Sequence, residues 1–332
     1  MTRVIHTGQA LVDVVLEVPA LPRRGQNVMA TSSTRYAGGS VNVLVAAARF
    51  GASCVLAGAH GTGPNGDLIR SALAGEGISA SAAPIVSRDT AACLVLVEPS
   101  AERTFVTELG AEREISVSSL SASAPSPGDL VCVTGYSLAL QSTRDPLLAW
   151  LATLAPEVVV VLDPGAAFAG LPAQVRSTML GHTDIWTSNA EEAADLLAAL
   201  GAPLPADADT MADPASAIAP LLRGDAITLV RDGPLGCAVT VSGRTTLVPG
   251  FPQEPVDTNG AGDTHTGALM AEIAAGRDWV EACRRANAAA AIKVTRRGPA
   301  TAPTGGEVAE FLRASAGVER TPVRSTTGEP GA

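Results

Sequence analysis

Apolar and polar residues alternate in blocks along most of the chain. Short apolar runs that end in polar residues or glycine occupy residues 53–61, 129–135, 157–165, 183–189 and 226–233. Several are followed by segments with apolar residues at helical spacing, such as 66–77 and 190–200. Strands that alternate with helices are typical of a parallel sheet covered on both faces. The pattern therefore predicts an α/β protein, with ligands expected outside the carboxyl ends of its strands.

Residues 11–37 and 90–109 break this rhythm. Both alternate apolar and polar residues without an intervening helical segment. This pattern is typical of antiparallel strands with one exposed face, and it predicts a small β layer that forms a lid, a dimer surface or both. We expect one domain over residues 1–312, followed by a polar, mobile tail over 313–332.

Composition narrows the class of protein. The net charge of -10 argues against general nucleic-acid binding, which needs clustered Lys and Arg. The chain has neither a signal-peptide pattern nor 18 consecutive apolar residues, so we expect a cytoplasmic protein without a membrane segment. The five cysteines are widely spaced and fit free, buried thiols in a reducing compartment. The spacing of Cys and His matches no common zinc site.

The chain contains a single lysine, Lys293. Because Ile292 precedes it where a Walker A loop requires glycine, a P-loop phosphate site is excluded. Lys293 stands in an alanine-rich helical segment, and we expect its side chain to run along the surface with the amine in solvent.

Residues 257–267 read "DTNGAGDTHTG" and precede a helical segment. A dinucleotide loop would require a third glycine where His265 stands, which disfavours that interpretation. A helix N-cap at Asp263 remains open, as does a phosphate site in which small residues expose the helix N-terminus. An aspartate beside a bound phosphate would repel it unless the carboxylate removes a proton from a hydroxyl. The segment therefore predicts a base beside an anion hole, and Asp263 can act as base and cap together.

Four segments resemble the PfkB-type carbohydrate kinases, the ribokinase-like family. They are "DTNGAGDTHTGALM" from residue 257, "AGGSVNVLVAAARFGA" from 37, "SNAEEA" from 188 and "ANAAAAIKVTRRGP" from 286. They occur in the family's order and span residues 37–299. The resemblance implies a three-layer fold with a mostly parallel central sheet, flanking helices and a small β lid. It also implies ATP-dependent phosphorylation of a sugar hydroxyl, with magnesium.

The resemblance also implies site residues. Asp263 would be the general base, and the anion hole would consist of Gly260, Ala261 and Gly262. The sugar would be held by Asp13, Gly38, Gly39 and Asn42. The nucleotide would lie against Asn189, Arg231, Gly233, Gly236 and Asn287, although relatives often carry Thr or Lys in place of Arg231. Glu192 would act on magnesium through water, and Asp257 and Asn259 match a monovalent-cation site of relatives activated by potassium.

Departures from the family pattern concern specificity. Ser40 and Leu44 replace other small residues of the first signature, and His265 replaces an aromatic residue. We expect His265 to be a packing or hydrogen-bonding neighbour rather than a second base.

The substrate is only partly constrained. Residues 37–43 contain no basic residue, although Arg35 is close, and residues 162–170 lack the arginine that sugar-acid kinases of the family often carry there. The resemblance therefore favours a neutral pentose or hexose. A nucleoside kinase is the alternative, with Tyr36 and Phe105 stacking on a base. Less favoured are a non-catalytic sensor and a hydrolase at residues 135–139, which lack the second glycine of a nucleophile elbow. A homodimer through the β lid is also expected.

Overall fold

The computed structural model describes residues 2–100 and 102–318. Its larger sheet has nine strands in the order β13-β12-β11-β10-β9-β8-β1-β4-β5. Neighbours from β11 to β5 are parallel, whereas β12 and β13 are antiparallel additions at one edge. The strands are β1 (Arg3–His6), β4 (Ser53–Leu56), β5 (Ser79–Ala80), β8 (Leu130–Thr134), β9 (Val159–Asp163), β10 (Ile185–Asn189), β11 (Ile227–Arg231), β12 (Gly236–Val241) and β13 (Arg244–Pro249). The predicted mostly parallel sheet is confirmed.

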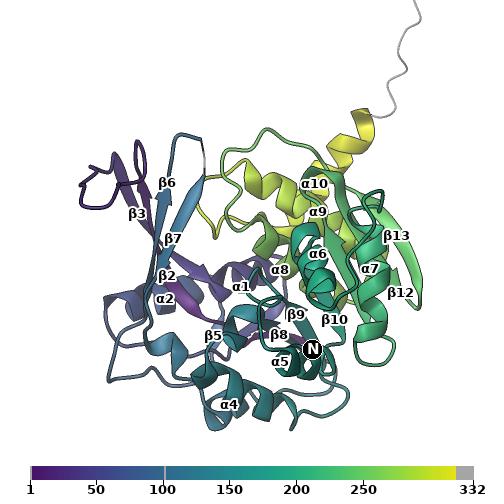
Figure 1. Cartoon of the computed structure of the whole chain (residues 1–332), viewed down its shortest axis with the longest axis horizontal. Coiled ribbons are helices and arrows are strands. Elements are labelled where there is room, and N and C mark those ends of the chain that lie inside the picture. The colour runs from purple at the N-terminus through teal and green to yellow at the C-terminus, as the bar shows by residue number, and fades with distance from the viewer. Residues whose placement is uncertain (1, 101, 319–332) are drawn as a thin grey trace, which may run out of the picture.

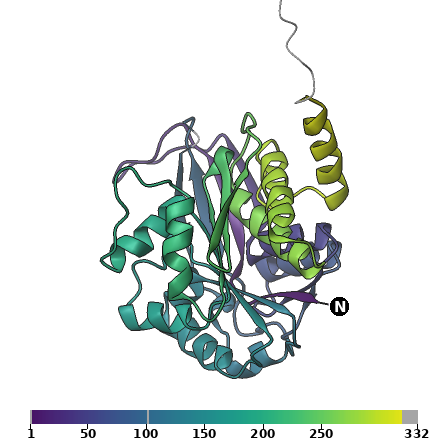
Figure 2. The same ribbon diagram turned by 90° about the vertical axis from the view of Figure 1, so that its right-hand side faces the viewer.

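Helices cover both faces of this sheet (Figures 1 and 2). One face carries α3 (Val117–Ser121), α4 (Gln141–Leu151), α5 (Ala173–Leu180), α6 (Ala190–Ala199) and α7 (Ala212–Ile218). The other carries α1 (Ser40–Arg49), α2 (Pro64–Gly75), α8 (Ala261–Ala274) and α9 (Trp279–Val294), with α10 (Gly305–Val318) against α9. Short 3₁₀ helices are η1 (Ala111–Arg113), η2 (Gly135–Leu138), η3 (Ala219–Leu221) and η4 (Gly233–Leu235).

The apolar strands are buried on both sides because their successive side chains point to opposite faces. In β8, Val131 and Val133 join the core under α3 to α7, whereas Leu130 and Cys132 join the core under α1, α2 and α8. Continuous apolar runs are therefore the expected sequence of these strands. All five cysteines are buried and free, as predicted.

A second sheet, here called the lid sheet, has the order β3-β2-β6-β7. Its strands are β2 (Ala10–Glu17), β3 (Ser32–Gly39), β6 (Ala92–Val97) and β7 (Arg103–Thr107). The predicted β layer is confirmed, but it is not wholly antiparallel, because β2 and β6 pair in parallel. Between β2 and β6 the chain passes through β3, α1, β4, α2 and β5. Such a crossover joins parallel strands.

The C-terminal boundary differs in part from the expectation. Helix α10 continues to Val318, so residues 313–318 are helical rather than part of a tail. The rest of the expected tail, 319–332, lies outside the described residues. Within residues 2–100 and 102–318, the helices fall short of the length and apolar character that a membrane crossing would need.

Candidate active site

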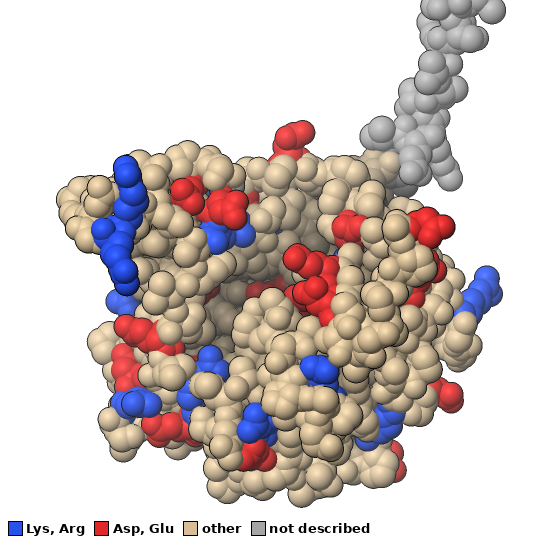
Figure 3. Space-filling model, viewed as in Figure 1, with Lys and Arg blue, Asp and Glu red and all other residues tan. Residues whose placement is uncertain are grey.

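A cavity of about 940 Å³ separates the lid sheet from the main sheet. Its floor includes the residues at the carboxyl ends of five parallel strands, namely His6, Thr134, Asp163, Asn189 and Arg231. The lid contributes residues of β2 and β6 and Phe105 and Thr107 of β7. Figure 3 shows the hollow opening between the two layers. The cavity therefore lies where a parallel sheet is expected to bind its ligands.

Helix α8 begins at the cavity, and its N-cap is Gly260. This glycine has a φ of 77°, and a Cβ there would come within 2.4 Å of the Pro299 carbonyl oxygen. Among the described residues, the amides of Gly262 and Asp263 donate no hydrogen bond. First-turn amides of this kind, at the positive end of the helix dipole, are suited to binding an anion.

Asp263 is the third residue of α8, and its side chain does not cap the helix. The expectation that it doubles as the N-cap was therefore wrong, since its carboxylate turns to the cavity and accepts a hydrogen bond from Asn42 Nδ2 at 2.9 Å. Burial raises the pKa of Asp263 to about 6, opposed by the Asn42 hydrogen bond and reinforced by the charge of Asp163. A carboxylate with this pKa accepts a proton readily near neutral pH.

Asp13 lies in β2 and faces the same cavity. Its carboxylate packs against Gly38, where a Cβ would lie 2.3 Å from Oδ2. Burial, and then the charge of Asp263, raise the pKa of Asp13 to about 7. Asn42 Oδ1 is buried without a partner. Two carboxylates and a half-satisfied amide thus converge, a combination that suits the binding of hydroxyl groups.

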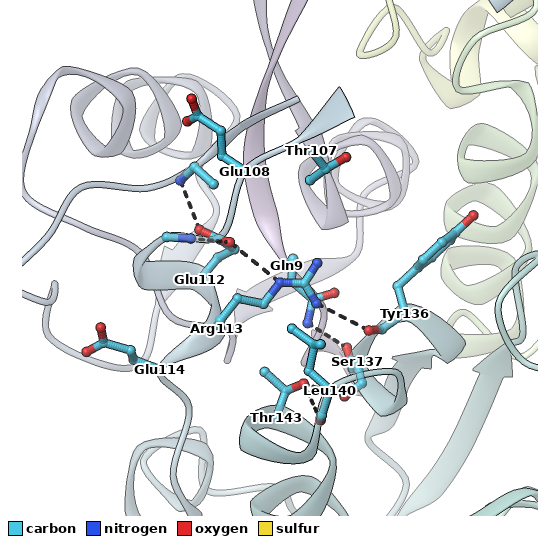
Figure 4. A network of polar contacts seen from close by, with 12 residues as sticks. Gln9, Thr107, Glu108, Glu112, Arg113, Glu114, Tyr136, Ser137, Leu140 and Thr143 are labelled. Atoms are coloured by element: carbon cyan, nitrogen blue, oxygen red, sulfur yellow. Dashed lines mark hydrogen bonds and ion pairs between the residues drawn. The ribbon is translucent and has the colours of Figure 1, made fainter. Parts of the chain in front are cut away.

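Another wall of the cavity, near Asp13 and Asn42, is shown in Figure 4. It comes from segments that sequence analysis did not identify as part of a site. Gln9 Nε2 donates to Ser137 Oγ at 3.0 Å, and Arg113 Nη1 donates to the Tyr136 carbonyl oxygen at 3.3 Å. Gln9, Arg113 and Tyr136 line the cavity. The lid adds Thr107, whose hydroxyl donates to Cys93 Sγ at 3.2 Å. No local motif marks these residues, because they come from four separate segments.

Asn189 and Glu192 form a reciprocal capping box at the start of α6. Asn189 Oδ1 accepts from the Glu192 amide at 2.7 Å, and Glu192 Oε2 accepts from the Asn189 amide at 2.9 Å. Both residues line the cavity. Burial, and then the charge of Asp163, raise the pKa of Glu192.

Asp163 is a cavity residue that the prediction missed. It accepts from Thr266 Oγ1 at 3.2 Å and lies 3.8 Å from Arg231 Nη2. Arg231 Nη1 in turn donates to Thr266 at 2.7 Å and to the Gly262 carbonyl oxygen at 3.3 Å. The sequence signal that could have identified Asp163 was its position at the carboxyl end of a central parallel strand.

The turn after β11 places Gly233 and Gly236 at the cavity. Asn287 of α9 also lines it, but its amide is engaged inside the protein. Nδ2 donates to the carbonyl oxygens of Val248 and Pro249, at 3.1 Å each, and Oδ1 lies 3.0 Å from His265 Nε2. His265 is therefore a hydrogen-bonding neighbour of Asn287.

Most of the predicted site residues line this one cavity, whereas Gly38, Gly260 and Asp257 lie behind its wall. Asn259 and Ala261 are part of the lining. In the described part of the chain, no group of three or more His, Cys, Asp or Glu side chains could hold a metal ion.

Lys293 corrects the prediction of a solvent-facing amine. Its side chain is 0% exposed, and Nζ donates to the Asp257 carbonyl oxygen at 2.7 Å. The helix turns this side chain inward because the Asp257 segment offers both a carbonyl oxygen and a neighbouring negative charge.

The chain is similar to known sugar kinases in both sequence and fold. The chain is 31% identical over 304 residues to the uncharacterized sugar kinase YegV of Escherichia coli (strain K12), covering 91% of each chain. It is 29% identical over 313 residues to ribokinase of Haemophilus influenzae, covering 92% of this chain and 96% of the relative. The structure of Arabidopsis thaliana ribokinase complexed with ribose and ATP has a TM-score of 0.77 at 22% identity, covering 94% and 99%.

The fold is accordingly ribokinase-like, with the lid sheet as its second layer of strands. Residues 1–304 match the family described as pfkB family carbohydrate kinase. The match spans the lid, the main sheet and helices α1 to α9, so it covers every wall of the cavity. The chain belongs to the pfkB family of carbohydrate kinases.

Proposed function

We propose that the protein transfers the γ-phosphoryl group of ATP to a hydroxyl of a small sugar, and that the cavity residues described above perform this transfer. The observation that supports this most strongly is the start of α8. There a carboxylate of raised pKa stands beside two amides without acceptors. A base next to an anion site is the arrangement that phosphoryl transfer to an alcohol needs.

Asp13 and Asn42 would hold the sugar so that one hydroxyl reaches Asp263. Asp263 takes the hydroxyl proton as the oxygen forms its bond to the γ-phosphorus and the bond to the β-phosphate oxygen breaks. The proton then leaves Asp263 for solvent after ADP and the sugar phosphate depart. Help from a positioned base of this kind contributes about 10² to 10⁴ in rate.

The negative charge of the transferred group would rest on the amides of Gly262 and Asp263. Gly260, Ala261 and Gly262 leave space for its oxygens because they carry little or no side chain. Arg231 is anchored beside this turn through Thr266 and the Gly262 carbonyl, and its charge would face the phosphates. These donors are fixed before reaction, so they need little reorganisation during it.

The nucleotide would bind at the end of the cavity away from Asp13 and Asn42. Asn189, Gly233, Gly236 and Asn287 would line the pocket for the nucleotide. Asn287 would shape the wall rather than contact the base through its amide, since that amide already bonds Val248, Pro249 and His265.

Magnesium would bind at the nucleotide end of the cavity, beside the carboxylates of Asp163 and Glu192. Asp163 and Glu192 are close enough for one charge to raise the pKa of the other, and Glu192 Oε1 has no hydrogen-bond partner among the described residues. With no protein cage of three ligands in that part of the chain, the ion would be held by phosphate oxygens and waters that these carboxylates orient. Magnesium would neutralise phosphate charge. Potassium does not fit beside Asp257, because Lys293 already donates to the Asp257 carbonyl oxygen.

A nucleoside substrate is less well supported. The expected stacking pair of Tyr36 and Phe105 does not form in the cavity, because Phe105 lines it and Tyr36 does not. Tyr36 packs beside Gly298, where a Cβ would lie 2.9 Å from its ring. With one lid aromatic facing the substrate end, a sugar is the better occupant.

We also propose that the protein forms a homodimer through the lid sheet and acts in the cytoplasm. Val106 of β7 is 59% exposed, and its side chain points to the opposite face of the strand from Phe105, which lines the cavity. Five free thiols suit a reducing compartment. Sedimentation equilibrium at micromolar concentration tests the dimer, and a monomer at all concentrations would contradict it.

The experiment that tests the function measures ADP formation with purified protein, ATP and magnesium over a panel of aldoses, ketoses, sugar acids and nucleosides. At least one sugar should give turnover that stops when magnesium is removed by EDTA. If no member of the panel gave ADP above the rate without sugar, although ATP bound, the kinase proposal would fail.

A further inference from the structure

The only lysine of the chain lies behind the proposed anion hole. Lys293 extends from the last turn of α9, is 0% exposed and donates to the carbonyl oxygen of Asp257. Asp257 begins the loop that leads through Gly260 into α8. A buried ammonium on a backbone carbonyl is expensive to desolvate, so it normally requires negative charge nearby. The Asp257 carboxylate and Asp263 supply that charge.

The oxygens of Asp257 are already engaged. Oδ1 accepts from the Asn259 amide at 2.9 Å and from Arg103 Nη2 at 3.1 Å, while Oδ2 accepts from the Gly298 amide at 2.9 Å. The carbonyl oxygen accepts from Lys293. Two protein cations therefore flank the residue that the family resemblance assigns to a potassium site. A potassium ion would need several of these oxygens and would meet the repulsion of a fixed ammonium and a guanidinium, so the residues do not fit it.

We propose that the Lys293 ammonium is a built-in substitute for a monovalent cation at the base of the α8 loop, and that the enzyme consequently works without potassium. The ammonium fixes the Asp257 carbonyl and so the direction in which the loop enters α8. Lys293 is a positioning residue, since it does not line the cavity. Its charge also lowers the pKa of Asp263, favouring the form that accepts a proton.

The unmodified enzyme gives the first test. Activity and melting temperature are measured in KCl, NaCl and choline chloride at equal ionic strength. We expect the same kcat/KM and the same melting temperature in all three salts. Activation of several-fold by potassium over choline, or stabilisation by potassium alone, would overturn the proposal.

Two variants sharpen it. Lys293→Ala removes the charge and opens space, whereas Lys293→Met removes the charge but keeps most of the volume. We expect both to lose at least about tenfold in kcat. Ammonium or potassium at tens of millimolar should restore activity to the alanine variant and not to the methionine variant. Full activity of Lys293→Ala in choline chloride would refute the role.

The pH profile separates positioning from simple loss of stability. Removing the positive charge should raise the pKa of Asp263, so the acidic limb of kcat/KM moves to higher pH in both variants. Arg284→Ala, an exposed change on the same helix, is the control and should leave the limb unchanged. If no substrate were found, the salt dependence of Mg-ADP binding to the same proteins would still decide the cation question.

A separate observation concerns Arg113, and this inference rests on the proposed function. Its side chain is only 14% exposed, lines the sugar end of the cavity and comes from η1, next to the lid sheet. Nε is buried and has no hydrogen-bond partner within residues 2–100 and 102–318. The neighbouring Glu112 lies 3.6 Å from Nε, beyond hydrogen-bond range, because its oxygens accept the amides of Ala91 and Gly110 at 2.9 and 3.0 Å.

Arg113 therefore brings to the substrate a guanidinium whose charge is paired with Glu112 but whose hydrogen-bond donors are only partly used. Its one hydrogen bond goes to the Tyr136 carbonyl, which leaves donors of the planar fork unused (Figure 4). Such a fork matches the two oxygens of a carboxylate. Arg113 lies neither beside the Gly38–Gly39 segment nor after β9, the two places where basic residues are scarce and a neutral sugar was expected for that reason.

The geometry points to a sugar acid as the preferred substrate, with its carboxylate on Arg113 and its hydroxyls on Asp13 and Asn42. The test compares kcat/KM for matched pairs of aldoses and their aldonic or ketoaldonic acids. We expect the acid to be favoured, and Arg113→Gln to lower its kcat/KM on the order of 10²-fold while changing the aldose by less than about threefold.

Arg88→Gln is the matched control, since Arg88 is exposed in the same region, 3.7 Å from Glu114, and does not line the cavity. Equal losses for acid and aldose in Arg113→Gln, or preference of the native enzyme for the aldose, would overturn the inference while leaving the kinase proposal intact. Absence of turnover with every sugar would instead contradict the kinase proposal, and isothermal titration of the acid without ATP would then test Arg113 alone.

Discussion

The two ends of the cavity are built in different ways. At the α8 end, one short segment supplies the base, the small residues and the exposed amides, and much of the chemistry uses the backbone. At the lid end, β2, the start of α1, η1 and η2 each contribute side chains, and Gln9 and Arg113 reach it from far apart in the chain.

This contrast separates chemistry from selectivity. A change at the α8 end should affect every substrate alike, because all acceptors meet the same base and the same amides. A change at the lid end should act on binding of particular acceptors.

Replacing the base should be the most damaging change. Asp263→Asn keeps the shape and the contact with Asn42 but cannot take a proton, so kcat should fall by about 10² to 10⁴ for every accepted sugar. ATP affinity, measured by calorimetry, should stay close to the native value. Asp195→Asn on the exposed side of α6 is the control. Turnover at the native rate would show that another group is the base.

Gly260→Ala should come next, with a loss on the order of 10² in kcat. The new Cβ meets the Pro299 carbonyl oxygen and favours a negative φ, so the first turn of α8 must shift. Gly201→Ala is a matched control, because Gly201 has a φ of 75° and open space around it. Similar losses of kcat in both variants would mean that general backbone strain, not the anion hole, is responsible.

Asn42→Ala should have a smaller effect, with KM for the sugar rising by about tenfold. Loss of its hydrogen bond should also raise the pKa of Asp263, moving the acidic limb of the pH profile upward. Asn27→Ala, in an exposed loop, is the control. A lower kcat with an unchanged KM and an unchanged pH profile would contradict this prediction, because it would mean that Asn42 contributes to the chemical step and not to sugar binding.

The smallest effect is the pH dependence of the native enzyme. Asp263 must be deprotonated to act as a base, so kcat/KM should fall as pH drops through about 6. Asp13, with its pKa near 7, should add to this decline if its charged form binds the sugar. A profile that stays flat from pH 8 to pH 5, recorded at saturating ATP, would contradict both assignments.

The same contrast explains what the sequence could reveal. The α8 loop and the N-x-x-E element are contiguous, so spacing was sufficient to locate Asp263 and Glu192. Strand ends were also recognisable, although Asp163 was overlooked. Arg113 depends on a tertiary arrangement that brings η1 to the cavity, and no local pattern encodes it. Lys293 was misjudged because helical alanine-rich context suggested solvent, whereas the Asp257 carbonyl and carboxylate lie on its inner side.

Cys93 gives the protein an intrinsic chemical reporter. Of the five buried cysteines, it alone lines the cavity, and its thiol is held by Thr107 of the neighbouring lid strand. Burial raises the pKa of Cys93, so alkylation is slow while the lid stays packed. The rate at which a small alkylating reagent modifies this thiol will therefore report whether the cavity under the lid sheet is open or occupied, without an engineered label.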